Sequence, residues 1–178
     1  MTFESPPRIT VLGVGNLLLS DEGVGVRVVE YLDARYSFPD QVRLVDGGVL
    51  GIGLMGLISE TDHLIVVDAV MNRNVPGTLY RLEGAQVPHR ILAKQSMHQM
   101  DLPEVLALCK AVGHEPQTIV LGVEPQDIHT LATELTPLVA GKIPELAALV
   151  TAELERLGVT CTPKEASQPG IFGPAPMP

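Results

Sequence analysis

Four side chains capable of metal binding or acid–base chemistry stand where the chain leaves a predicted strand or enters a predicted helix. Glu22 follows the glycine turn at residues 13–15, and Asp46 and Asp68 come directly after two apolar runs. His98 lies just before a further predicted helix. A carboxylate at a buried strand end is costly unless its charge is compensated, and a cation would compensate it. Carboxylates combined with one imidazole therefore predict a hard or borderline metal at the mouth of the fold.

Short apolar runs mark the elements that must position these side chains. Continuous apolar runs are typical of strands covered on both faces, as in parallel sheets. We expect such strands at Ile9–Val14, Val42–Val45, Leu64–Val67 and Thr118–Val123, with an edge strand at Gly77–Leu82. Apolar residues at helical spacing predict helices over Val24–Leu32, Leu50–Ser59 and Leu102–Val112, and from Thr136 onward with a kink or break at Pro144. Ser20 or Asp21 can cap the first of these helices.

The order of these elements predicts one three-layer α/β domain over residues 1–161. Its twisted, mostly parallel sheet would have about five strands and lie between helices. Residues 162–178 are rich in proline, and we expect a flexible tail there. Parallel strands present their carboxyl ends at one edge of the sheet, where α/β proteins bind ligands. The first three strands would therefore bring Glu22, Asp46 and Asp68 to a shared edge.

Composition excludes several classes of protein. The 178 residues carry a net charge of −9, whereas nucleic-acid binding needs clustered Lys and Arg. No apolar run approaches the ~18 residues that span a bilayer, and the first residues lack the pattern of a signal peptide. We therefore expect a soluble cytoplasmic protein. Cys109 and Cys161 form no C-x-x-C pair, which argues against a zinc finger, and Cys109 is expected in the core.

Each candidate residue also has a purely structural interpretation. Glu22 would favour the amino end of a helix by its charge alone. Asp46 before two glycines is typical of a turn, and Asp68 could accept hydrogen bonds from loop N–H groups. His98 alone would be typical of a capping or core histidine. The metal-site hypothesis therefore depends on the four residues as a set.

The glycine turn also resembles a nucleotide-binding loop, but its details differ. A dinucleotide fingerprint needs a third glycine where this chain has Leu18, and the acids Asp21 and Glu22 would repel a phosphate. The sequence contains no P-loop lysine, G-x-S-x-G elbow or H-E-x-x-H helix. A nucleotide-binding α/β protein stays an alternative to the metal site.

The ordered motifs of this chain resemble those of the nickel–iron hydrogenase maturation endopeptidases over roughly residues 8–158. They are Gly13-x-Gly15-Asn16-x-Leu18-x-x-Asp21-Glu22-Gly23-x-Gly25, Asp46-Gly47-Gly48, Asp68-Ala69 and Ser96-x-His98-Gln99. The resemblance implies a twisted sheet between helices. It also implies an endopeptidase that removes the C-terminal extension of the hydrogenase large-subunit precursor once nickel has been inserted.

The resemblance makes Glu22, Asp68 and His98 the metal-binding triad, with Asp46 a further acid near the site. The metal would be nickel held by the substrate, which then serves as the recognition mark, and zinc or another divalent ion could occupy the site in isolation. Either Asp46 or Glu22 would be the general base. A non-catalytic chaperone that checks the precursor for nickel is the remaining alternative.

Overall fold

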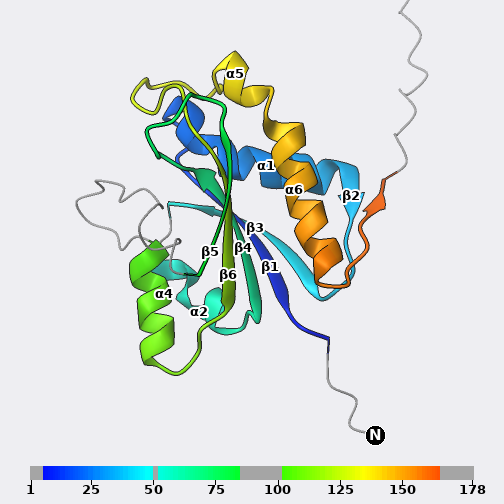
Figure 1. Ribbon diagram of the computed structural model, residues 1–178. Helices are drawn as coiled ribbons and strands as arrows, with labels where there is room; N and C mark the ends of the chain where they lie inside the picture. Colours follow the sequence, from blue (N-terminus) through cyan, green and yellow to red (C-terminus); the bar gives the residue numbers. More distant parts are fainter. Residues whose placement is uncertain (1–5, 50–51, 85–101, 165–178) are drawn as a thin grey trace, which may run out of the picture.

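The computed structural model describes residues 6–49, 52–84 and 102–164. Its centre is a five-stranded sheet in the order β3-β1-β4-β6-β5 (Figure 1). Parallel pairing joins β1 (Ile9–Val14), β3 (Val42–Gly48), β4 (His63–Ala69) and β6 (Gln117–Val123), whereas β5 (Leu79–Glu83) pairs antiparallel with β6 at the edge. The expected mostly parallel sheet is confirmed.

Helices cover both faces of this sheet and complete the three layers (Figure 1). On one face lie α1 (Val24–Arg35) and α6 (Ile143–Arg156), which also pack against each other. On the other lie α2 (Met55–Ser59) and α4 (Leu102–Ala111). Shorter helical turns are η1 (Ser20–Gly23), η2 (Ile52–Leu54) and α5 (Pro137–Ala140).

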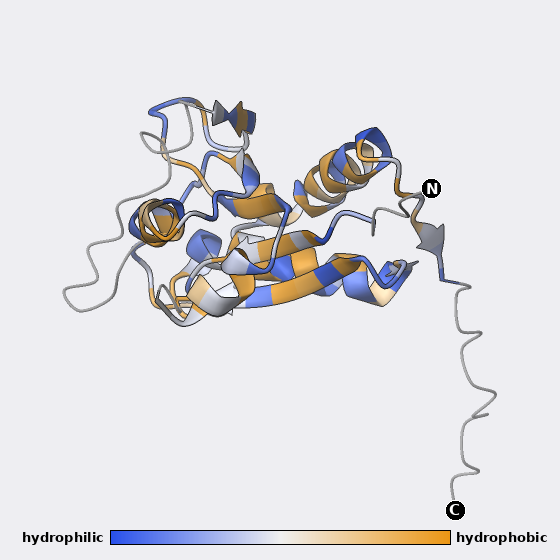
Figure 2. Ribbon diagram, turned by 90° about the horizontal axis from the view of Figure 1, so that it is seen from below, coloured by the Kyte–Doolittle hydropathy of each residue, from blue (hydrophilic) through white to orange (hydrophobic). Residues whose placement is uncertain are grey.

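Each layer has its own aliphatic core, and the sheet separates the two. Alternate strand residues face opposite layers, so Ile65 and Val67 of β4 pack on the α1 and α6 side while Leu64 and Val66 pack on the α2 and α4 side. Figure 2 shows the resulting apolar sheet between amphipathic helices. Cys109 is fully buried on the α4 side, as expected, and burial raises the pKa of its thiol.

The last part of the chain divides into two helices. Thr136 caps α5 by accepting a hydrogen bond from Val139 N, and Pro144 stands in the first turn of α6, where its missing N–H costs nothing. The predicted break at this proline is confirmed. No helix in the described ranges is long and apolar enough to cross a membrane.

A small second sheet extends the described fold beyond residue 161. β2 (Tyr36–Ser37) pairs antiparallel with β7 (Thr162–Pro163), and Lys164 N donates to Arg35 O at 2.7 Å. The first residues of the expected tail therefore pack against the end of α1. The rest of that tail, residues 165–178, lies outside the described part, and its flexibility stays a prediction.

Candidate active site

The chain reverses its path across the sheet between β1 and β4. From β1 it passes to β3 on one side and then returns to β4 on the other side. A reversal of this kind opens a crevice at the carboxyl ends of the two strands, and open α/β sheets bind ligands there. Glu22 follows β1, and Asp68 is the second-last residue of β4, so both carboxylates flank the crevice.

Glu22 belongs to η1, which folds back closely over the end of β1. Gly15 makes this approach possible, because its φ is +143° and a Cβ there would lie 1.8 Å from the carbonyl oxygen of Glu22. η1 also contacts β4. Glu22 is 8% exposed in this position. The glycine turn seen in the sequence therefore delivers a nearly buried carboxylate to the crevice.

Asp68 is fully buried at the carboxyl end of β4. It continues the alternation of Leu64 and Val66, so its side chain is on the sheet face that α2 and α4 cover. One carboxylate oxygen, Oδ1, accepts a hydrogen bond from Ala69 N at 2.8 Å. This donor belongs to β4 itself, so the loop N–H bond considered as a structural role stays a prediction, and the observed bond engages one oxygen of the carboxylate.

Asp46 reaches the same edge from the other face. It shares the alternation of Val42 and Leu44, which pack on the α1 and α6 side, and its side chain is exposed. Its Oδ1 accepts a hydrogen bond from Gly48 N at 2.9 Å, which is the turn interaction that the sequence indicated. A role for Asp46 as general base stays a prediction.

His98 lies in the range 85–101, outside the described residues. Among the residues that are described, no three His, Cys, Asp or Glu side chains group so as to hold a metal ion. The structure thus places Glu22 and Asp68 at the crevice, whereas the third member of the predicted triad and the metal itself stay predictions.

Asp21 has a structural role that the sequence did not reveal. It is fully buried, and its carboxylate accepts hydrogen bonds from the backbone N–H groups of Gln126, Asp127 and Thr136 at 2.9, 2.9 and 2.7 Å. The Thr136 hydroxyl donates a further bond at 3.0 Å. The expectation that Ser20 or Asp21 caps the following helix is wrong, because the N-cap of α1 is Gly23 and Asp21 instead fastens η1 to the segment after β6.

Glu124 is a second buried carboxylate at this edge that the sequence analysis missed. It follows β6 directly, is 5% exposed, and accepts hydrogen bonds from Asn72 N at 2.9 and 3.2 Å and from the Tyr80 hydroxyl. Burial, and then the hydrogen bond to Glu124, raise the pKa of Tyr80. The rule that found Asp46 and Asp68, an acid after an apolar strand, applies equally to Glu124 and would have found it.

The arrangement separates two kinds of carboxylate. The carboxylate oxygens of Asp21 and Glu124 accept hydrogen bonds from loop N–H groups and from hydroxyl groups, and these bonds hold the loops in place. Glu22 and Asp68 flank the crevice itself. Glu22 is nearly buried and Asp68 fully buried, and carboxylates of this kind fit a divalent cation, because oxygen donors are the ligands that hard and borderline metals take.

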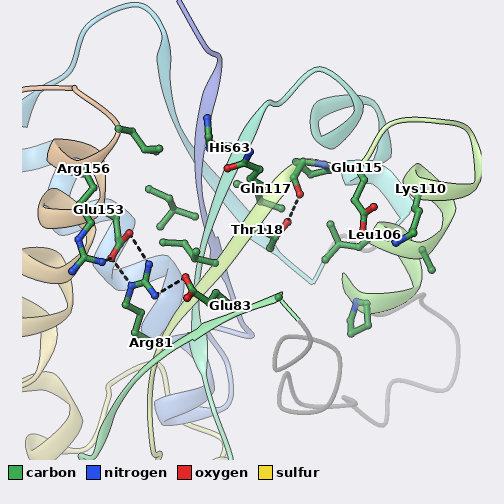
Figure 3. Close-up of a pocket in the computed structure, with 18 residues that line it drawn as sticks. His63, Arg81, Glu83, Leu106, Lys110, Glu115, Gln117, Thr118, Glu153 and Arg156 are labelled. Carbon is green, nitrogen blue, oxygen red and sulfur yellow. Dashed lines mark hydrogen bonds and ion pairs between the residues drawn. The ribbon is translucent and has the colours of Figure 1, made fainter.

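A separate cavity of about 940 Å³ lies at the opposite edge of the sheet (Figure 3). Its wall includes the first residues of β4 and β6, His63 and Gln117. On the other side of the cavity, Arg81 and Glu153 form an ion pair, with Nε of Arg81 2.6 Å from Oε1 of Glu153. Because this cavity adjoins the amino ends of the parallel strands, it is distant from the crevice with Glu22 and is no part of the candidate site.

Comparison with known proteins agrees with this architecture. A family model described as hydrogenase maturation protease matches residues 26–153. The chain is 42% identical to hydrogenase 2 maturation protease of Escherichia coli K12 over 161 residues, which cover 89% of this chain and 98% of that protein. It is 43% identical to the hydrogenase expression/formation protein HupM of Azotobacter chroococcum, covering 90% and 78%. The solved structure of the hydrogenase maturating endopeptidase HybD from E. coli matches with a TM-score of 0.82 at 41% identity, covering 88% and 98%.

Proposed function

The chain belongs to the hydrogenase maturation protease family, and on this premise we propose that it removes the C-terminal extension of a nickel–iron hydrogenase large-subunit precursor after nickel insertion. Family members are peptidases, so the reaction class is hydrolysis of a peptide bond. The position of Glu22 and Asp68 on either side of the crevice between β1 and β4 supports this crevice as the site of cleavage.

In this proposal nickel belongs to the substrate. Glu22, Asp68 and His98 would contact nickel that the precursor holds, so the metal marks the precursor as ready for cleavage. The low exposure of Glu22 and Asp68 supports this part, because carboxylates withdrawn from water bind a cation more strongly than solvated ones. A metal in this position can polarise a carbonyl or activate water.

Peptide hydrolysis also needs a group that moves a proton. A water oxygen bonds to the scissile carbonyl carbon, the carbon–nitrogen bond breaks, and the proton that leaves the water ends on the departing amine. Glu22 and Asp46 are the candidate bases. Glu22 is at the crevice, whereas Asp46 is exposed and accepts a bond from Gly48 N, so these features favour Glu22 as the group that takes the proton.

Nickel dependence tests the recognition step. Purified protein is incubated with precursor that carries nickel and, separately, with nickel-free precursor, and the intact mass of each precursor is followed. We expect shortening of the nickel-loaded form alone. Equal cutting of both forms would remove nickel as the mark, and binding without any shortening would favour a chaperone that checks the precursor without cleaving it.

A further inference from the structure

Among the described residues, nearly all of the exposed large apolar side chains lie around one end of the molecule. Val75 and Leu131 are 74% and 81% exposed, although buried aliphatic residues fill both cores. In the described ranges, all but one of the exposed large apolar residues lie in segments that follow the carboxyl ends of the parallel strands. We name this set the apolar rim; it consists of Leu18, Val49, Met71, Val75, Leu131 and Leu138. The exception is Val112, which follows α4.

Hydrogen bonds join most of these segments into one surface. Ala132 N donates to Leu18 O at 3.1 Å, which places the turns that carry Leu18 and Leu131 side by side. Gly77 N donates to Glu124 O at 2.8 Å, and Glu124 N donates to Thr78 O at the same distance. Figure 1 shows η1, α5 and the loops that follow β4 and β6 gathered at this end of the molecule. Scattered apolar residues need no explanation, but a connected group marks an interaction site.

The position of the rim identifies its partner. A protein substrate can bring its chain to Glu22 and Asp68 only by laying its surface over the loops that surround the crevice. We infer that the apolar rim is the docking surface for the folded part of the precursor, an inference that rests on the proposed function. The precursor would present an apolar patch to it.

Charged groups beside the rim predict what borders that patch. Asp46 and Glu134 are exposed there, and Asp127 lies in the same loop as Glu134. Hydrogen bonds from Thr130 and His129 lower the pKa of Asp127 to about 2, so it is ionised at every physiological pH. Arg73 is an exposed opposing charge in the loop after β4. This acidic excess matches a partner surface whose apolar patch is bordered by Lys or Arg.

Truncation of the rim provides the test. Leu18→Ser, Val75→Ser and Leu131→Ser are combined in the full chain, and Val112→Ser is the matched control, since Val112 is 65% exposed on the opposite side of the fold. Binding of nickel-loaded precursor is measured on a Glu22→Gln background, which separates docking from cleavage. We expect the triple variant to raise Kd at least tenfold, because an apolar contact of this kind is commonly worth that factor or more. The control should leave Kd unchanged.

Kinetics on the otherwise wild-type background complete the test. The triple variant should raise KM and leave kcat at saturating precursor unchanged, since the rim contributes to binding and not to the chemical step. Circular dichroism confirms that the variants fold, and each single substitution is measured as well. If the wild type cuts the precursor and the triple variant has the same Kd and KM as the wild type, the docking surface alone is overturned. Self-association of the wild-type chain that the triple variant abolishes would overturn it as well. Failure of the wild type to cut at all would instead overturn the proposed function.

Discussion

Replacing Asp21 with Asn should destabilise the fold by about 3 kcal/mol. Its Oδ2 accepts bonds from Gln126 N, Asp127 N and the Thr136 hydroxyl, and its Oδ1 accepts one from Thr136 N. An amide has a single oxygen, so at best three of these bonds survive and the amide N–H₂ group faces the N–H of Thr136. One bond to a charged acceptor is worth about 1.5–3 kcal/mol, and the surviving bonds weaken because the acceptor becomes neutral.

Denaturant unfolding followed by circular dichroism measures this effect. In a thermal scan the loss corresponds to roughly 6–12 °C in Tm for a chain of this size. Glu30→Gln is the control, because Glu30 is exposed and pairs with Arg27 on the surface, and its cost should stay within about 0.5 kcal/mol. An Asp21→Asn protein as stable as the wild type would refute the conclusion that this carboxylate fastens η1 to the segment after β6.

Two further predictions concern local features. Gly15→Ala should cost more than about 3 kcal/mol in the same unfolding assay, because the new Cβ meets the carbonyl oxygen of Glu22 at a strained φ; a loss below 1 kcal/mol would contradict that close approach. The hydrogen bond from Arg81 holds the pKa of Glu153 below its usual 4.5, so the ion pair stabilises the protein above that pH and its contribution is lost as the pH falls through the folded pKa. Glu153→Gln should therefore lower stability by about 2 kcal/mol near pH 7 and progressively less in acid, whereas a pH-independent difference would argue against the pair.

Strand positions were predictable because buried parallel strands are continuous apolar runs. The ends of the strands were harder to predict, because the last residues of a strand can be polar or glycine and then fall outside the apolar run. β4 was expected to stop at Val67, yet Asp68 and Ala69 continue the pairing with Gly122 and Val123 of β6. Asp68 therefore sits within the strand instead of after it. The end of β4 is set by backbone pairing with residues of β6 more than fifty positions away, and the local sequence contains no sign of that pairing.

The site residues that could be predicted are those that lie next to an apolar strand in the sequence. Glu22 and Asp68 were found because each follows an apolar run that ends at the shared edge. The pleat then determines on which face a side chain lies, so Asp46 and Asp68 approach that edge from opposite faces. The role of Asp21 could not be predicted, because Gln126 and Thr136, which donate to it, are 105 and 115 residues away in the chain.

We propose that Glu22 and Asp68 act together at the crevice in cleavage of the precursor. The most direct test of this proposal is the intact mass of nickel-loaded precursor after incubation with the wild type, with Glu22→Gln and with Asp68→Asn, each shown to be folded by circular dichroism. We predict that the wild type shortens the precursor and that each variant slows processing by at least about 100-fold. Processing by both folded variants at the wild-type rate would show that neither carboxylate takes part in cleavage.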